Sequence, residues 1–324
     1  MRVANTDSYG KVKQSVSSRK KTSRINFWQA LKRDKLLYLL LMPVVLYFII
    51  FKYVPMAGLL IAFKNFSPYL GFFESDWVGL FHFRNLFASP DFMMIIKNTL
   101  GLSLVSLVFY FPAPIILALL LNEVKNLAFK RVTQTFVYIP HFISYVIVAT
   151  LTYQLFNVTD GIVNQIIKEI TGSTIPFLSG PQYFRGLIVG QSIWKETGYG
   201  TIVFLAALSG VDTELYEAAS VDGAGRWKQM WHITLPAIKG TIIIMLILRV
   251  GAILNTGFEQ IFLVQNSLNI STSEVFDTYV YTRGIKQGQY SYATAVGFFK
   301  SVVGMILVLG SNWVAKRAGE SGLY

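Results

Sequence analysis

Long apolar stretches dominate this sequence and restrict the folds that it can adopt. A helix that crosses a bilayer needs about 20 mainly apolar residues. Six windows meet this requirement, at about 36–57, 99–121, 133–156, 186–208, 241–264 and 292–314. The second window contains no charged residue, whereas the fourth contains Lys195 and Glu196. The sequence therefore predicts an all-α, polytopic membrane protein with six transmembrane helices.

Composition agrees with a membrane protein. Charged residues make up 14% of the chain, against roughly a quarter in soluble domains. Cysteine is absent, which excludes disulfides, cysteine-ligated metals and thiol catalysis. The three histidines, His82, His141 and His232, are far apart in sequence and have no close second ligand. We therefore expect no metal site. Prolines inside the windows do not exclude membrane spans, because neighbouring helices can bond the freed carbonyls.

The basic residues indicate the direction of the spans. Ten of them lie in the first 35 residues, beside only two acids. This distribution favours a cytosolic tail near anionic lipid over nucleic-acid binding, and the tail lacks the apolar run of a signal peptide. With both termini in the cytosol, inner segments hold eighteen basic residues and outer segments eight, as the positive-inside rule requires. The predicted parts are a basic tail at 1–35, a transmembrane domain at 36–318 and a C-terminal tail at 319–324.

A polar segment at 211–236 interrupts the apolar pattern and is predicted to lie in the cytosol between spans four and five. Asp212 or Thr213 can cap a helix whose first turns hold acids. Two glycines in DGAG predict two short helices, the second ending before Pro236. Small residues along the segment would allow another backbone to approach closely. The segment is therefore predicted to be a docking surface.

Two other interpretations of this segment remain. It could be an amphipathic helix on the bilayer surface, with Trp227 and Trp231 as anchors. It could also be a helix-turn-helix that reads DNA. Attachment at both ends to membrane spans disfavours DNA binding, so we expect no nucleic-acid partner.

The same residues resemble the EAA signature of the membrane subunits of binding-protein-dependent ABC importers. Glu217-Ala218-Ala219, Asp222-Gly223-Ala224 and Leu235-Pro236 carry the resemblance in order and spacing. Upstream, WVGLFHFRNLFASPDFMMIIKNTL at 77–100 is similar to the segment before the core spans of carbohydrate-uptake permeases. The resemblance runs from about residue 35 to the C-terminus. It implies the ABC importer permease fold, with six transmembrane helices and a cytosolic coupling helix.

The resemblance also implies partners and roles. In that family, this segment, hereafter the coupling segment (211–236), inserts into a cleft of a cytosolic ATPase. Carried over, Glu217 contacts a basic residue there, Ala218 and Ala219 pack closely, and Gly223 makes the turn. The implied coupling residues are Glu217, Ala218, Ala219, Asp222, Gly223, Ala224, Leu235 and Pro236. Implied partners are a second homologous permease, an ATPase dimer that binds ATP and Mg, an extracytoplasmic solute-binding protein, membrane lipid and an oligosaccharide.

The chain lacks the motifs of an enzyme. It has no G-x-x-x-x-G-K-[ST] loop for nucleotide phosphates, and no G-x-S-x-G or H-E-x-x-H. Any ATPase must therefore be a separate chain. We expect a non-catalytic subunit, without a cofactor of its own, in the bacterial cytoplasmic membrane.

Charged residues inside the spans are candidates for the substrate path, because charge is costly in a membrane. Adjacent Lys195 and Glu196 point about 100° apart on a helix and are not expected to pair well. Aromatic and polar neighbours would suit a sugar, which gives the candidate set Tyr153, Trp194, Lys195, Glu196, Tyr199, Arg249, Asn255, Glu259 and Lys300. A structural alternative is that Glu259 and Lys300 tie spans five and six, while Lys195 extends outward to the membrane surface.

The segments YVPMAGLLIAFKNFSP and FDTYVYTRGI are similar to those of permeases for acidic oligosaccharides such as alginate or rhamnogalacturonan fragments. The sequence thus predicts a permease subunit of an importer for such oligosaccharides. A neutral oligosaccharide remains an alternative cargo. Two rival classes are an ion-coupled secondary transporter and a membrane receptor or scaffold whose coupling segment binds another cytosolic protein.

Overall fold

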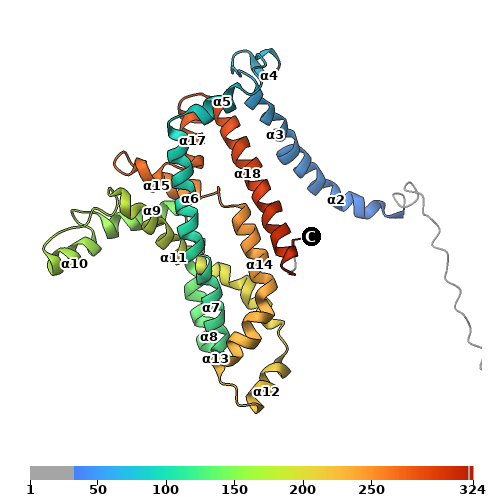
Figure 1. The fold of residues 1–324 in the computed structure, drawn as a ribbon, viewed down its shortest axis with the longest axis vertical. Helices are drawn as coiled ribbons and strands as arrows, with labels where there is room; N and C mark the ends of the chain where they lie inside the picture. Colours follow the sequence, from blue (N-terminus) through green and yellow to red (C-terminus); the bar gives the residue numbers. More distant parts are fainter. Residues whose placement is uncertain (1–32, 320–321, 324) are drawn as a thin grey trace, which may run out of the picture. The chain divides into compact units, whose positions relative to one another are not determined.

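A computed structural model describes residues 33–319, 322 and 323 (Figure 1). Nearly all of the predicted basic tail, and residues 320, 321 and 324 of the predicted C-terminal tail, lie outside the described residues. Within them, every regular element is a helix, apart from one isolated bridge between Lys64 and Trp77. The predicted all-α class is confirmed.

The chain forms two compact units, Met1–Gly58 and Leu59–Tyr324. In the first, α2 (Lys35–Phe48), the π-helical turn η1 (Ile49–Tyr53) and α3 (Val54–Met56) follow one another without a break. They continue through the 3-10 helix η2 (Ala57–Phe63) as one apolar run of 29 residues. This run contains the first predicted span.

The second predicted span corresponds to α6 (Asp91–Phe109) and α7 (Pro112–Glu123), preceded by the short helices α4 (Gly71–Glu74) and α5 (Phe81–Ala88). Together α6 and α7 form a 33-residue apolar run. Pro112 and Pro114 are tolerated because they lie in the first turn of α7, where backbone N–H groups have no intrahelical acceptor.

The third predicted span is sharply bent. The chain forms α8 (Leu127–Tyr138) and η3 (Ile139–Phe142), then turns by 98° into α9 (Tyr145–Phe156). Pro140 lacks the N–H that would continue the hydrogen bonds of α8. The Ser144 hydroxyl accepts a hydrogen bond from the Ile147 N–H at 3.4 Å and so starts α9. The short helix α10 (Ile162–Thr171) follows.

The fourth predicted span lies within α11 (Pro181–Ser209), a continuous helix of 29 residues. At about 1.5 Å per residue, α11 is long enough to cross a bilayer. Among the described residues, four helices are both long and apolar enough for this, or five if the bent α8–α9 pair is one span. Because α11 contains Lys195, Glu196 and other polar residues, it falls below that level of apolarity.

The fifth predicted span is wrong in its bounds. After α12 (Thr213–Val221), a single helical run comprises α13 (Arg226–Gln229), the π turn η4 (Met230–Thr234) and α14 (Leu235–Gly251). The second short helix predicted for the coupling segment therefore does not end before Pro236 but continues into α14. The wider π turn directly before Pro236 accommodates a ring that would otherwise clash with the carbonyl four residues earlier. The chain then leaves helical geometry before α15 (Phe258–Val264).

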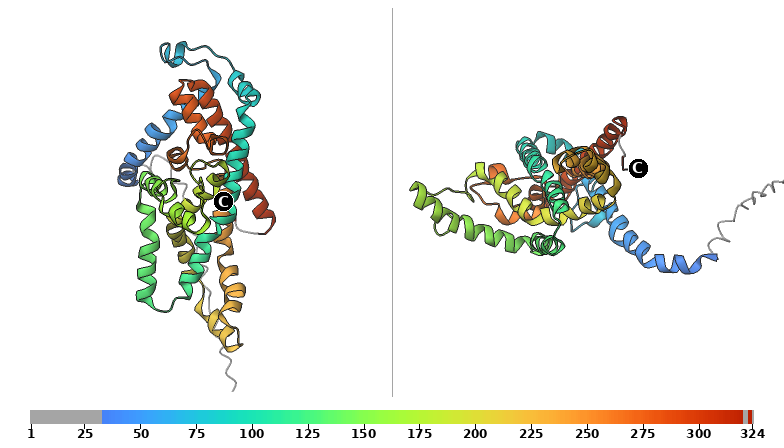
Figure 2. Two further views of the ribbon diagram at one scale, coloured as in Figure 1. Left: turned by 90° about the vertical axis from the view of Figure 1, so that its left-hand side faces the viewer. Right: turned by 90° about the horizontal axis from the view of Figure 1, so that it is seen from below.

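The sixth predicted span matches the long helix α18 (Tyr290–Arg317). It follows α16 (Ile270–Ser273), α17 (Phe276–Tyr281) and the π turn η5 (Thr282–Lys286). In the second unit, α4, α5 and α17 lie at one end, and α12 and α13 lie at the other (Figure 1). Figure 2 shows α7 and α8 as antiparallel neighbours joined by a turn at the α12 end.

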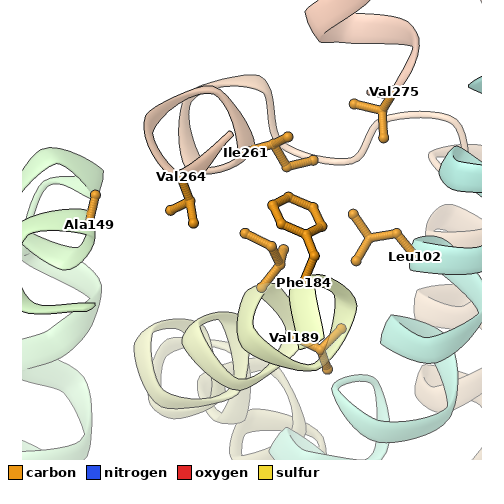
Figure 3. Packing of buried hydrophobic residues seen from close by; sticks show 8 residues of the cluster. Leu102, Ala149, Phe184, Val189, Ile261, Val264 and Val275 are labelled. Carbon is orange, nitrogen blue, oxygen red and sulfur yellow. The ribbon is translucent and has the colours of Figure 1, made fainter. Parts of the chain in front are cut away.

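Three apolar clusters hold the second unit together. In one, the ring of Phe184 on α11 lies between Ile261 of α15 and Leu102 of α6, all nearly inaccessible to solvent (Figure 3). A second joins α5, α6, α17 and α18, and a third joins α7, α11 and α14. Gly198 of α11 faces the Val137 carbonyl so closely that a Cβ atom there would overlap it. This contact fixes α11 against the end of α8.

Candidate functional site

The start of the coupling segment is capped as predicted. The Asp212 carboxylate accepts a hydrogen bond from the Glu214 N–H at 2.9 Å, and Glu214 lies in the first turn of α12. Glu217 and Ala218 are exposed on the same short helix, and Ala219 is half-buried. The small and acidic side chains are therefore accessible to a partner.

The predicted break at DGAG is confirmed and depends on one glycine. Gly223 has a φ of +79°, in the left-handed region. The Gly223 N–H donates to the Ser220 carbonyl at 3.1 Å, and the Ala224 N–H donates to the Ala219 carbonyl at 2.8 Å. Asp222 and Gly223 are exposed, and Ala224 is half-buried. This turn reverses the chain between α12 and α13.

Side-chain hydrogen bonds tie α12 to the helix that follows it. The Tyr216 hydroxyl lies 3.0 Å from the Thr234 hydroxyl. The Gln229 amide donates to the Ser220 hydroxyl at 2.9 Å and to the Ala224 carbonyl at 3.0 Å. Leu235 packs against the apolar cluster of α7, α11 and α14. These contacts hold α12 against the α13–α14 helix.

That helix ends at a polar cavity inside the second unit. A cavity of about 30 Å³ lies where the chain leaves α14, and it is lined by Leu102, Ser103, Ser106, Ile188, Val189, Ser192, Arg249, Asn255 and Thr256. Thr256 has a buried hydroxyl oxygen with no hydrogen-bond partner among the described residues. Irregular backbone at membrane depth occurs only where it is buried in protein or lines a cavity.

Arg249 is the one charged residue of this cavity lining. Its guanidinium donates to the Ser106 hydroxyl at 2.7 Å and lies 5.2 Å from the centre of the Tyr110 ring. No carboxylate of the described residues forms an ion pair with it. The neighbouring hydroxyl and the aromatic ring stabilise the cation without neutralising it. The lining of the cavity thus carries a positive charge that no carboxylate of the described residues neutralises.

Lys195 and Glu196 form a different polar cluster, on the middle of α11. The expectation that they pair poorly is wrong, because the ammonium lies 3.1 Å from the Glu196 carboxylate. The Lys195 side chain is 6% exposed and donates to the His141 carbonyl at 2.6 Å, so it does not extend outward. Glu196 also bonds the His141 ring at 2.6 Å and the Tyr145 hydroxyl at 3.2 Å. The cluster joins α11 to the bend between α8 and α9.

The other predicted path residues do not form one site. Tyr199 stacks on the His141 ring at 3.9 Å. Trp194 lines a mainly apolar groove of about 640 Å³ between α9 and α11, and Tyr153 is exposed on α9. Lys300 forms an ion pair with Asp277, so the alternative in which Lys300 pairs with Glu259 is wrong.

Several polar residues of these clusters were not in the predicted set. Gln260 of α15 donates to the Gln191 side chain at 3.0 Å, and Gln191 donates to the Thr152 hydroxyl at 2.6 Å. His141, Tyr145 and Asp277 were also missed. The sequence signal that could have found the missed residues is a polar side chain within or beside an apolar window. This criterion identifies Gln191 and Gln260 as readily as Lys195.

Comparison with known proteins decides the family. Residues 110–320 match the family described as binding-protein-dependent transport system inner membrane component. The chain belongs to this family. It is therefore a multi-pass permease subunit of an ABC importer. The matched residues include the coupling segment and Arg249 at the end of α14.

Relatives of this permease match over nearly the whole chain. Protein LplB of Bacillus subtilis (strain 168) is 59% identical over 300 residues, covering 93% of this chain and 94% of LplB. The polygalacturonan/rhamnogalacturonan transport system permease protein YteP of the same organism is 52% identical over 305 residues, covering 94% and 95%.

Solved structures agree with the fold. One chain belongs to a bacterial ABC transporter involved in the import of the acidic polysaccharide alginate, with 44% identity and a TM-score of 0.83. The match covers 90% of this permease and 98% of that chain. Another chain, with 42% identity and a TM-score of 0.84, belongs to a bacterial alginate ABC transporter in complex with an alginate pentasaccharide-bound periplasmic protein. That match covers 92% of this permease and 99% of that chain.

Proposed function

We propose that this permease carries acidic oligosaccharides into the cell. The observation that carries this proposal is the likeness over nine-tenths of the chain to a permease named for polygalacturonan and rhamnogalacturonan and to a chain of an alginate importer. The unpaired Arg249 at the end of α14 supports it, since uronate sugars carry carboxylates. A neutral oligosaccharide is the alternative cargo.

A separate ATPase that binds ATP and Mg would bind the coupling segment and move it. In this proposal, Glu217 pairs with a basic residue of the ATPase, while Ala218, Ala219 and Gly223 allow close packing. Ala224, Leu235 and Pro236 connect this contact to α14, and Asp222 lies in the exposed turn. Both termini and α12 lie in the cytosol. A second homologous permease and an extracytoplasmic solute-binding protein complete the importer.

The sugar would pass the polar cavity beside the break between α14 and α15. Discontinuous helices commonly line the substrate sites of transporters, because their free backbone groups bind polar ligands. Arg249 and Asn255 line this cavity, and Arg249 would bind a uronate carboxylate. Because α14 joins the coupling segment to Arg249 in one helix, movement of α12 would reposition the carboxylate site.

The coupling proposal is tested by reconstituting the chain with its ATPase, partner permease and binding protein. We expect Glu217→Ala to reduce ATP-driven uptake by about tenfold, since a charge-assisted hydrogen bond contributes about 1.5–3 kcal/mol. Glu214→Ala is the matched control, because this acid is also exposed on α12 and should leave uptake within about twofold. Equal uptake by both variants would contradict the assignment. Uptake that needs a proton gradient and no ATPase would favour a secondary transporter.

The cargo proposal is tested with trigalacturonic acid and its neutral methyl ester. We expect Arg249→Gln to reduce uptake of the acid by about tenfold and uptake of the ester by less than about threefold. Arg131→Gln, at an exposed arginine of α8, serves as the control. An equal loss for both sugars would assign Arg249 to packing instead of carboxylate binding.

A further inference from the structure

A second polar cavity lies at the end of the second unit opposite α12. It has a volume of about 530 Å³ and is bounded by the loop before α4, by α5, and by the chain from α17 to the start of α18. Figure 1 shows α5 and α17 together at that end. Its lining residues are Asn65, Phe66, Phe81, His82, Asn85, Ser89, Tyr279, Arg283, Gly288, Gln289, Tyr290, Ser291 and Tyr292. None of them belongs to the path at Arg249.

Free amide groups surround this cavity. Asn65, Asn85 and Gln289 are exposed, and their side chains form no hydrogen bond with the described part of the chain. Each amide offers a carbonyl acceptor and two N–H donors on one small plane. Neighbouring hydroxyls of a sugar ring, which also donate and accept, match that arrangement.

Aromatic rings lie beside these amides. Phe81 is 54% exposed and Tyr290 is 37% exposed at the edge of the cavity, and the Tyr290 ring packs edge-on against Phe66 at 6.2 Å. Exposed aromatic faces offer apolar area to the C–H faces of a sugar. The lining thus combines apolar faces with planar amides.

The charged groups of the lining are already neutralised. Arg283 donates to the Asp91 carboxylate at 2.8 Å and to the Gln287 side chain at 3.1 Å. Burial lowers the pKa of the His82 imidazole below its ordinary value, which favours the neutral ring, and its Nε2 lies 3.1 Å from the Lys64 carbonyl. A ligand would therefore be recognised by its hydroxyl groups more than by its charge.

We propose that this cavity binds a sugar unit of the oligosaccharide at the extracytoplasmic mouth of the permease. This proposal rests on the proposed function and orientation. Its volume lies in the range of small-molecule pockets. The core of a protein interface is commonly apolar and poor in unpaired polar groups, so the polar, concave lining favours a saccharide over a protein loop. Such a site would hold one end of the chain while the other enters the path.

The test measures direct binding by the full chain in lipid nanodiscs. Trigalacturonic acid and its methyl ester are titrated by calorimetry, and hydrogen exchange locates the contact. We expect both sugars to bind with dissociation constants within about threefold of each other and to protect amides of residues 81–92 and 279–292. The Asn85→Ala/Gln289→Ala double variant should raise both constants by about tenfold.

Gln154→Ala is the matched control, since Gln154 is also an exposed amide without a side-chain hydrogen bond among the described residues, and it should leave both constants unchanged. Unaltered binding by the double variant, or absence of protection in both segments, would overturn the proposal. In a parallel titration with the sugar-free binding protein, a double variant that loses this protein but keeps both sugars would also overturn the proposal and would identify the cavity as a protein-docking surface. Because binding is measured on the chain alone, failure of uptake in the assembled importer would count against the proposed function and not against this site.

Discussion

At the scale of single residues, two nearby glycines of the coupling segment have different conformational needs. Gly223 has a φ of +79°, whereas Gly225 has a φ of −69° and precedes α13. A Cβ atom at either position would meet no heavy atom within 4 Å. The two therefore differ in backbone strain and not in available space.

This difference predicts that Gly223→Ala alters the turn and Gly225→Ala does not. A left-handed conformation costs an L-residue about 1–2 kcal/mol, so we expect Gly223→Ala to reduce ATP-coupled uptake several-fold. Gly225→Ala should retain uptake within about twofold. The measurement is sugar uptake per ATP hydrolysed in proteoliposomes. Equal behaviour of the two variants would show that the turn does not limit coupling.

Only some of the caps, turns and ion pairs could be predicted from the sequence. The Asp212 cap and the glycine turn depend on residues close in the chain, and both were predicted correctly. The pairing of Lys300 with Asp277 joins residues on different helices. Periodicity carries no information on such distant neighbours, so the alternative partner suggested for Lys300, Glu259, was wrong.

At the scale of helices, the apolar windows predicted the positions of the spans more accurately than the bends within them. The first, second and sixth windows each lie in one apolar helical run. The third window contains a bend of 98° and the fifth continues past the end of α14, because hydropathy does not distinguish a straight helix from two helices joined at an angle. Pro140 marks one of these breaks, but Pro236 lies inside a continuous helix beside a π turn. Proline alone therefore does not decide the outcome.

The packing of α11 against the end of α8 yields a stability prediction. Gly198→Ala would place a Cβ atom against the Val137 carbonyl, so one helix must shift, at a cost of about 1–3 kcal/mol. Gly190→Ala lies on the same helix, where a Cβ atom meets nothing within 4 Å, and it should be neutral. Thermal unfolding of both variants in detergent would measure the difference. Similar midpoints would contradict the close contact.

At the scale of the whole molecule, one helical run joins the proposed path to the coupling segment. The coupling segment continues through η4 into α14, and the polar cavity begins where α14 ends. The family motif identified the first of these sites, because its residues are contiguous in sequence. Of the second, only Arg249 and Asn255 were among the predicted residues. Ser106 and Ser192 were missed, because they come from other helices and meet Arg249 only in the fold.

The proposed orientation of the molecule can be tested with engineered thiols. The chain has no cysteine, so each introduced thiol is the only one. Tyr69 is 98% exposed in the loop before α4, and Val221 is 88% exposed at the end of α12. The neighbouring helices α4 and α12 lie at opposite ends of the second unit (Figure 1). In right-side-out membrane vesicles, we expect a membrane-impermeant maleimide to label Tyr69→Cys at once. Val221→Cys should react only after permeabilisation, because the proposed orientation places the coupling segment in the cytosol. Detergent-solubilised protein is the control, in which both thiols must react. Labelling of Val221→Cys from outside would reverse the topology and remove α12 from the reach of a cytosolic ATPase.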